Sequence, residues 1–234
     1  MGKQSKKIRR LLAENDYLIA PCAYDALSAR AIQASGFSIA GTTGYGMHGV
    51  VLGQPGTGLL ALNETVSILS KMVDAVDIPI LADAEGGYGS ALNVIRAVKE
   101  YEKTGVAGLF IEDQKQPPNC PFIKAPELIS TDEMVGKIEA AVATREDPDM
   151  VIIARTDAPF EEAIERANAY MEAGADMVKI LPKSRQELEA LPPRVNGPIH
   201  LGLYAAHGPG KHKCSYLRIC GDCPQAISHL YPRH

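Results

Sequence analysis

The stretch that decides the fold is residues 78–114, which read IPILADAEGGYGSALNVIRAVKEYEKTGVAGLFIEDQ. A short apolar run ends at two carboxylates, Asp83 and Glu85, and glycines follow at once. The next segment has the apolar spacing of a helix, and Gly105 ends it before a second apolar run begins. This order predicts a strand, a helix and a second strand, which is the repeating unit of parallel sheets.

The same alternation continues along most of the chain. Continuous apolar runs predict strands at 17–20, 37–41, 78–82, 107–111, 150–154, 176–180 and 198–202. Segments with helical spacing predict helices at 5–14, 24–35, 63–75, 90–104, 131–145, 159–173 and 184–191. Strands without polar alternation are covered on both faces, which indicates a parallel sheet of the α/β class.

We therefore predict that residues 1–202 form one repeating βα architecture, as found in open α/β sheets and in (β/α)8 TIM-type barrels. Gly36, Gly105 and Gly174 stand at equal intervals, each between a helix and the next strand, as in a repeating βα architecture. Such barrels typically need about 250 residues, and this chain has 234. If the chain forms such a barrel, we expect it to be incomplete at the C-terminus.

Composition and charge exclude several other classes of protein. The chain is 46% apolar with a net charge of −4, so neither a nucleic-acid surface nor a membrane surface is predicted. The basic cluster KKIRR at 6–10 is interpreted as the exposed face of the first helix. No apolar run has the length of a spanning helix, and the N-terminus lacks the pattern of a signal peptide. We expect a cytoplasmic protein without a disulfide framework.

Polar residues gather where the predicted strands end, which is where such barrels place their active sites. Asp83 and Glu85 follow one strand, Glu112 follows the next, and Arg155 ends the one after. On a strand, residues two apart share a face, so Asp83 and Glu85 are expected to point together. Three carboxylates form an all-oxygen site suited to Mg²⁺ or Mn²⁺, and an Arg suits a carboxylate or phosphate. The alternative is that these acids are solvated or cap the following helices.

The glycine-rich GYGMHG at 44–49 matches the spacing of a dinucleotide-binding loop. No helix is predicted to open there, so we interpret it as a flexible loop over the barrel mouth. Its backbone N–H groups could hold an anion.

In combination, these residues resemble the isocitrate lyase / phosphoenolpyruvate mutase superfamily. The resemblance rests on 79–114, on IIARTDA at 152–158, on APCAYDALSARAIQASGF at 20–37 and on LGQPGTGLLALNE at 52–64. It implies a (β/α)8 barrel that binds Mg²⁺ and a 2-oxo-carboxylate or its enolate. It also implies a homo-oligomer, a tetramer in the family.

The resemblance also implies roles for individual residues. The metal motif of the family aligns with Asp83 and with Glu85, where this chain has Glu in place of the usual Asp. The third carboxylate of the family aligns with Glu112. Its substrate-binding Arg lands on Arg155. Its substrate loop lands on Thr43, Gly44 and Tyr45, whose backbone N–H groups would hold the enolate oxygen.

The chain also departs from the family pattern. Cys120 stands where the lyases carry the cysteine that protonates the product, but Pro118-Asn119 and Pro121-Phe122 replace its usual neighbours. The alternative interpretation of Cys120 is a small apolar loop residue. Gly56 and Leu181 replace two acids of the family pattern, which weakens the outer shell around the metal.

Residues 203–234 differ in character from the rest and show no helix or strand spacing. They hold four of the six histidines and three of the five cysteines. Three interpretations remain open: a zinc site made by His212, Cys214, Cys220 and Cys223; a disordered family-specific tail; or a replaced native C-terminus.

The sequence thus predicts a Mg²⁺-dependent carbon–carbon lyase acting on a small carboxylate. The expected substrate is a 2-hydroxy di- or tricarboxylate of the methylisocitrate or dimethylmalate type, cleaved to a 2-oxo acid such as pyruvate. One alternative is phosphonate or oxaloacetate-type chemistry on the same scaffold. Another is an inactive relic of the family.

Overall fold

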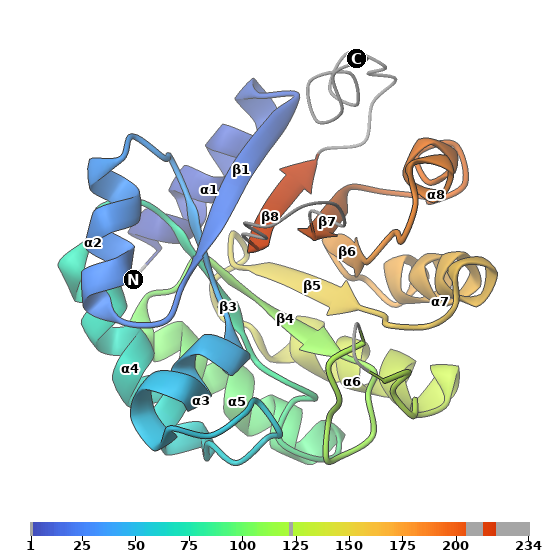
Figure 1. The fold of residues 1–234 in the computed structure, drawn as a ribbon, viewed down its shortest axis with the longest axis horizontal. Coiled ribbons are helices and arrows are strands. Elements are labelled where there is room, and N and C mark those ends of the chain that lie inside the picture. The colour runs from blue at the N-terminus through green and yellow to red at the C-terminus, as the bar shows by residue number, and fades with distance from the viewer. Residues whose placement is uncertain (1, 122–123, 205–212, 219–234) are drawn as a thin grey trace.

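The strands of the computed structural model close into a barrel (Figure 1). The structure describes residues 2–121, 124–204 and 213–218. In order of pairing, its strands are β1 (Tyr17–Ala23), β2 (Ala40–Thr42), β3 (Ile80–Asp83), β4 (Gly108–Glu112), β5 (Val151–Arg155), β6 (Met177–Ile180), β7 (Ile199–Tyr204) and β8 (Lys213–Arg218). From β1 to β7 each strand is parallel to the next. The predicted α/β TIM-type fold is confirmed.

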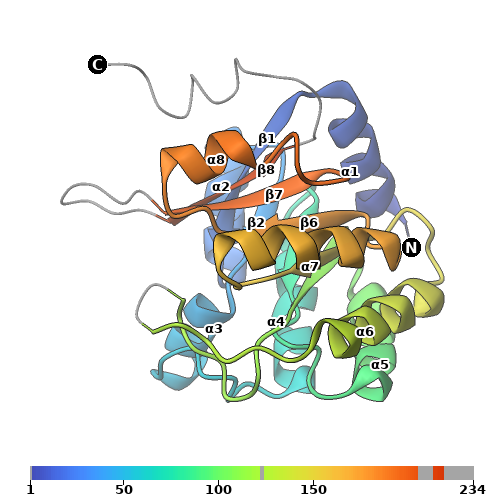
Figure 2. The same cartoon turned by 90° about the vertical axis from the view of Figure 1, so that its right-hand side faces the viewer.

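Helices lie around the strands, as Figures 1 and 2 show. They are α1 (Lys3–Glu14), α2 (Ala26–Ala34), α3 (Gly44–Leu52), α4 (Leu62–Ala75), α5 (Ala91–Thr104), α6 (Thr131–Thr144), α7 (Phe160–Glu172) and α8 (Arg185–Ala190). All except α3 match a predicted helix to within two residues at each end. No helix in the described ranges has the length and apolar character needed to cross a membrane.

Buried apolar side chains form two clusters because successive residues of a strand face opposite sides of the sheet. The inner cluster contains Leu18, Ile39, Leu81, Phe110, Ile153 and Met177, together with Ile8 of α1. The larger outer cluster packs between the strands and the helices and includes Ala82, Leu109, Ile152 and Val178. This alternation assigns every strand residue at the site to the inside or the outside of the barrel.

Helix α1 packs its apolar face against the inner cluster. Ile8 is fully buried there. Arg9 donates to the carbonyl of Asp149 at 3.0 Å and pairs with Asp176 at 2.7 Å, so it binds the segments that lead into β5 and β6. The basic cluster at 6–10 is therefore not simply an exposed face, because one of its arginines fastens α1 to the barrel.

Strand β8 lies in the part of the chain for which the sequence showed no strand spacing. It pairs antiparallel with both β7 and β1 and so closes the barrel. Antiparallel neighbours can be joined by a short connection, whereas a parallel strand needs a long crossover. Only residues 205–212 separate β7 from β8, which is too few for a crossover helix. The division of the chain at residue 202 stays a prediction; His212, Cys220 and Cys223 lie outside the described residues.

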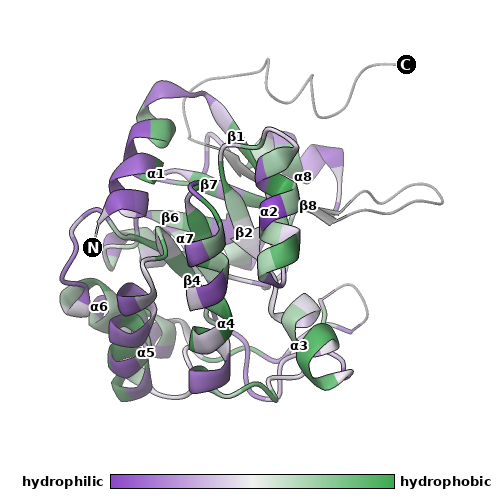
Figure 3. Cartoon of the chain, turned by 90° about the vertical axis from the view of Figure 1, so that its left-hand side faces the viewer, coloured by the Kyte–Doolittle hydropathy of each residue, from purple (hydrophilic) through white to green (hydrophobic). Residues whose placement is uncertain are grey.

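Helix α3 occupies the stretch that was predicted to be a flexible loop. Thr43 caps it by accepting a hydrogen bond from the Gly46 N–H at 3.3 Å. Part of its ribbon is coloured as hydrophobic in Figure 3, and Val50 and Val51 are exposed on it. A helix therefore does follow a strand here, contrary to the sequence argument against a dinucleotide site. The closed barrel nevertheless speaks against a dinucleotide site, because the dinucleotide fingerprint belongs to an open doubly wound sheet.

Candidate active site

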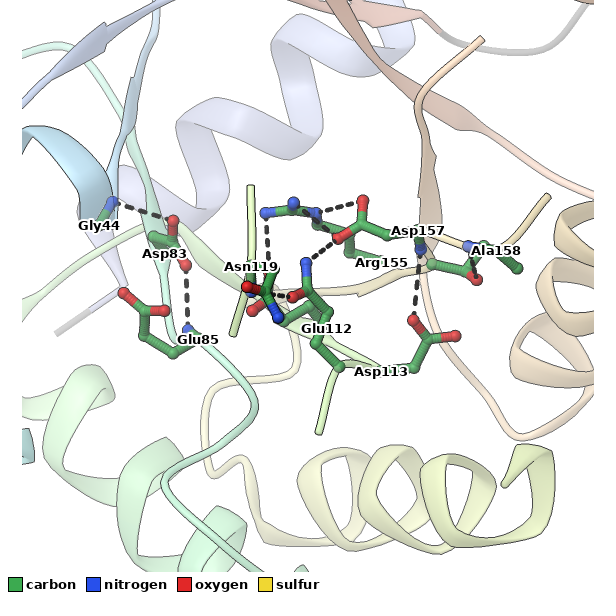
Figure 4. A network of polar contacts seen from close by, with 11 residues as sticks. Gly44, Asp83, Glu85, Glu112, Asp113, Asn119, Arg155, Asp157 and Ala158 are labelled. Atoms are coloured by element: carbon green, nitrogen blue, oxygen red, sulfur yellow. Dashed lines mark hydrogen bonds and ion pairs between the residues drawn. The ribbon is translucent and has the colours of Figure 1, made fainter. Parts of the chain in front are cut away.

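Asp83 ends β3 and is held by hydrogen bonds on both carboxylate oxygens. Oδ2 accepts from the Gly44 N–H and Oδ1 accepts from the Glu85 N–H, each at 3.0 Å (Figure 4). The Asp83 N–H donates to Thr42 Oγ1 at 2.8 Å, and the hydroxyl of Tyr101 donates to its carbonyl at 2.7 Å. The carboxylate is thus fixed in place, with the N-terminus of α3 directed at it.

Glu85 lies beside Asp83, but not for the reason that the sequence suggested. The shared strand face requires the strand to continue through Glu85, and β3 ends at Asp83. Glu85 instead adopts a left-handed backbone with φ of 50°, and its carbonyl accepts from the Glu112 N–H at 2.9 Å. A side chain on Gly44 would collide with the Glu85 carboxylate, so the glycine is what allows α3 to approach.

The carboxyl groups of Glu85 and Glu112 repel one another in a buried setting. Burial raises the pKa of Glu85 well above its usual value, and the charges of Asp83 and Glu112 raise it further, while Arg155 lowers it. Burial likewise raises the pKa of Glu112 to about 7, against the opposing effect of Arg155. The site therefore concentrates more negative charge than its own cations neutralise.

Arg155 lies at the centre of the polar network. It is the register partner of Glu112 across β4 and β5, and its Nη1 lies 2.9 Å from Glu112 Oε2. On its other edge, Nε and Nη2 bind the two oxygens of Asp157 at 3.1 and 2.7 Å (Figure 4). The pKa of Arg155 is raised well above its usual value by Asp157 and Glu112, although burial alone would lower it.

Several positioning residues had no predicted role. Gln114 donates to Asp157 Oδ2 at 2.5 Å and accepts from the Asn119 N–H at 2.8 Å. Asp157 and Gln114 belong to the polar groups that follow strands, so their place at the site could be seen in the sequence. Tyr101 stands in the last turn of α5 with no comparable signal.

The predicted substrate loop, Thr43 to Tyr45, begins α3 beside the acids. The N–H groups of Thr43 and Gly44 already donate, to the carbonyl of Ala23 at 3.2 Å and to Asp83. The side chain of Tyr45 is exposed. The structure thus brings the loop to the acids, with the amides of Thr43 and Gly44 engaged within the protein.

Cys120 is half-buried in the long segment between β4 and α6. Its carbonyl accepts from the Lys124 N–H at 3.1 Å. Among the described residues its thiol forms no disulfide. The structure therefore brings together Asp83, Glu85, Glu112 and Arg155, and does not join Cys120 to them.

The carboxylate set fits a dication that keeps part of its water shell. Within the described residues, no three His, Cys, Asp or Glu side chains stand close enough to hold a metal ion directly. Mg²⁺ is commonly bound by one or two carboxylates while several waters remain. Asp83 and Glu85 supply hard oxygen donors, Glu112 lies on the adjoining strand end, and the excess negative charge favours a cation.

Comparison with known proteins gives this arrangement a family. The model of the phosphoenolpyruvate phosphomutase family matches residues 8–218. The chain is 44% identical over 196 residues to 2,3-dimethylmalate lyase of Eubacterium barkeri, covering 82% of this chain and 68% of that protein. The chain spans 53% to 68% of the length of the curated relatives it matches.

Solved structures agree with the sequence comparison. Oxaloacetate acetylhydrolase bound to 3,3-difluorooxaloacetate superposes with a TM-score of 0.82 at 34% identity, over 90% of this chain and 73% of that one. Phosphonopyruvate hydrolase bound to oxalate and Mg²⁺ gives 0.74 at 30% identity, over 85% and 71%. The chain belongs to the phosphoenolpyruvate phosphomutase family, within the PEP mutase/isocitrate lyase superfamily of enzymes.

Proposed function

We propose that the protein is a Mg²⁺- or Mn²⁺-dependent lyase that cleaves a carbon–carbon bond of a 2-hydroxy di- or tricarboxylate. The substrate is of the methylisocitrate or dimethylmalate type, and one product is a 2-oxo acid such as pyruvate. The observation that carries this proposal is the buried cluster of Asp83, Glu85 and Glu112 beside Arg155, at the carboxyl ends of β3 to β5. The 44% identity to 2,3-dimethylmalate lyase supports the substrate class.

In this mechanism the residues of the chain bind the substrate and stabilise charge. Asp83, Glu85 and Glu112 would hold the dication, and the ion, when bound, would supply positive charge that stabilises an enolate. Arg155 clamps a substrate carboxylate, and the backbone of Thr43 to Tyr45 faces the enolate oxygen.

The reaction balances as a cleavage followed by a protonation. The 2-hydroxyl group loses its proton to solvent and becomes the carbonyl of the 2-oxo acid, and a proton from solvent later restores the thiol of Cys120. The bond between C2 and C3 breaks, and its electron pair passes to the departing fragment as an enolate. Cys120 Sγ gives that carbon its proton, which requires the segment around Cys120 to approach the acids when substrate binds. The expected cytoplasmic location and tetrameric assembly are part of the same proposal.

A second candidate is hydrolysis of an oxaloacetate-type substrate or of a phosphonate. It is favoured by the superposition on oxaloacetate acetylhydrolase and on phosphonopyruvate hydrolase. Pro118-Asn119, in place of basic neighbours before Cys120, favours it too. An inactive relic of the family is the third possibility that the experiment must separate.

A panel of 2-hydroxy acids, oxaloacetate and phosphonopyruvate, incubated with Mg²⁺, tests these proposals. The expected result is release of pyruvate or another 2-oxo acid from a 2-hydroxy dicarboxylate, abolished by EDTA and by Asp83→Asn. Glu139→Gln, an exposed acid on α6, is the matched control and should retain full activity. Oxalate and acetate from oxaloacetate would support the second candidate. Unchanged activity in Asp83→Asn would overturn the metal assignment, and no turnover of any substrate would favour the relic.

A further inference from the structure

Two basic side chains inside the barrel have no role in the proposed mechanism. Lys179 on β6 is the register partner of Arg155 on β5, and His200 on β7 is in turn the partner of Lys179. Register partners in a parallel sheet share a face, so these three side chains all project to the inside. Lys179 and His200 therefore lie next to the network of Arg155.

Both side chains rest on the same aromatic ring. Lys179 Nζ lies 3.8 Å above the ring centroid of Phe110, a residue of the inner cluster. The ring of His200 meets that of Phe110 edge-on, with centroids 6.1 Å apart. Phe110 precedes Glu112 by two residues on β4, one layer deeper in the barrel. The two basic groups thus form a floor beneath the acids and Arg155.

Lys179 is a buried cation that forms no ion pair within the described residues, although Asp83 and Asp157 attract it from a greater distance. Lys137, Arg155 and Arg166, the other largely buried cations in the described ranges, each lie within 4.0 Å of a carboxylate. No described carboxylate comes that close to Lys179, which is 8% exposed. The face of Phe110 compensates only part of the cost of burying this charge.

His200 has no hydrogen-bond partner within the part of the chain that the structure describes. It is 1% exposed, and neither Nδ1 nor Nε2 has a hydrogen-bond partner among the described atoms. An unsatisfied buried polar group typically costs about 1–3 kcal/mol, so folded proteins rarely retain one without a use. A ligand that brings acceptor oxygens to this floor would satisfy both side chains.

We propose that Lys179 and His200 form an anion subsite at the floor of the barrel, which receives one carboxylate of a dicarboxylate substrate while Arg155 clamps the other. This subsite deepens the proposed function and rests on it for the identity of the ligand. The ammonium donates to the carboxylate, and His200 donates from whichever ring nitrogen carries the proton. Burial, with a contribution from Arg155, lowers the pKa of Lys179 to about 8, so the group is still mostly charged near pH 7.

The test uses a matched pair of ligands in the presence of Mg²⁺. Succinate and butyrate have similar chain lengths and differ by one carboxylate. The ratio of their dissociation constants therefore measures how much the second carboxylate strengthens binding. Isothermal titration of the wild-type protein should show a preference for succinate. Lys179→Met keeps the length of the side chain and removes its charge, and it should reduce that preference at least tenfold.

Two further variants complete the comparison. His200→Asn should reduce the preference by a smaller factor, about threefold to tenfold, because it removes the weaker donor. Lys183→Met removes an exposed lysine from the same segment and should leave the preference unchanged. An unchanged ratio in a folded Lys179→Met protein would overturn the proposal.

A measurement on the wild-type protein covers the case in which Lys179→Met does not fold. Reductive methylation followed by peptide mass spectrometry reports the accessibility of each lysine. Succinate should slow methylation of Lys179 and leave Lys183 unaffected, whereas butyrate should protect neither. Equal methylation of Lys179 with and without succinate would contradict the subsite.

These results are separable from the outcome of the activity panel. A protein that turns over no substrate but shows the Lys179-dependent preference keeps the subsite and loses the lyase proposal. A protein that turns over substrate with the same KM in Lys179→Met as in wild type keeps the lyase and loses the subsite.

Discussion

Glu85 illustrates how much a single residue is constrained at this site. Its left-handed backbone is uncommon for a residue other than glycine, and such positions concentrate at functional sites. Hydrogen bonds from its N–H to Asp83 and from the Glu112 N–H to its carbonyl hold it there. The same bonds keep a third acidic group in a buried cluster, where its charge is unfavourable unless a cation is present.

Glu85→Gln is expected to stabilise the metal-free protein. The pKa of Glu85 is raised by burial and by neighbouring acids, so at pH 8 folding must bury its charge or take up a proton. The neutral amide avoids this cost, roughly 1–2 kcal/mol, and should raise Tm by roughly 2–6 °C. Thermal unfolding with and without Mg²⁺ measures this, and the rise in Tm caused by Mg²⁺ should shrink. A lower Tm for Glu85→Gln than for the Glu139→Gln control would contradict the argument.

Arg155→Met, in contrast, should destabilise the folded protein. It leaves Glu112 and Asp157 buried without their shared cation, and breaking a buried pair typically costs about 3–5 kcal/mol. Urea unfolding monitored by circular dichroism gives the free energy. Arg185→Met is the control, because its pair with Glu189 is exposed and should be worth less than about 1 kcal/mol. Equal losses in the two variants would show that the network of Arg155 adds no stability.

At the scale of elements, α3 depends on one buried histidine. His48 Nδ1 lies 2.7 Å from the carbonyl of Gly44, and Nε2 accepts from the N–H groups of Leu59 and Leu60 at 2.9 and 3.1 Å. Because Nε2 accepts twice, the proton is on Nδ1. The imidazole thus ties the first turn of α3, which carries Gly44 to Asp83, to the segment that precedes α4.

His48→Ala should therefore loosen this segment more than the rest of the barrel. It leaves the buried N–H of Leu60 and the partly buried N–H of Leu59 without an acceptor, at a cost of about 2 kcal/mol. Hydrogen exchange at the amides of Leu59 and Leu60 should accelerate roughly thirtyfold, while amides of β4 change little. Val50→Ala removes an exposed side chain from the same helix and should leave these amides protected. Uniform acceleration across the barrel would instead indicate global destabilisation.

At the scale of the whole molecule, the barrel brings charged residues from separate strands together. Residues distant in the sequence meet because parallel strands end at the same rim. Glu112 has a folded pKa of about 7, above its usual 4.5, so between these values the folded state holds a proton that the unfolded state has released. The contribution of Glu112 to the free energy of unfolding consequently decreases as the pH rises from 4.5 to 7.

Mg²⁺ should reverse this loss, and its effect should grow with pH. A bound dication compensates the carboxylates, and below pH 7 it must displace the proton of Glu112. At one fixed, subsaturating Mg²⁺ concentration, the rise in Tm should be clearly larger near pH 8 than near pH 6. Asp83→Asn should show a small rise at both. A larger rise near pH 6 in the wild type would rule out proton-linked metal binding at this cluster.

The sequence by itself determined the α/β class, seven of the strands, seven of the helices and the group of acids at strand ends. These follow from local apolar spacing and from residues that come directly after strands, so a short window of sequence contains them. It also placed Arg155 beside Glu112, because neighbouring parallel strands end together.

Tertiary structure decided the remainder, because it depends on contacts between distant segments. Helix α3 forms in a glycine-rich stretch because His48 and Asp83 bind its first turn. Strand β8 forms because β1 and β7 leave a gap that an antiparallel strand can pair across. Glu85 faces Asp83 through a left-handed turn, and Lys179 and His200 meet over Phe110, because closing the sheet brings separate strands to one interior.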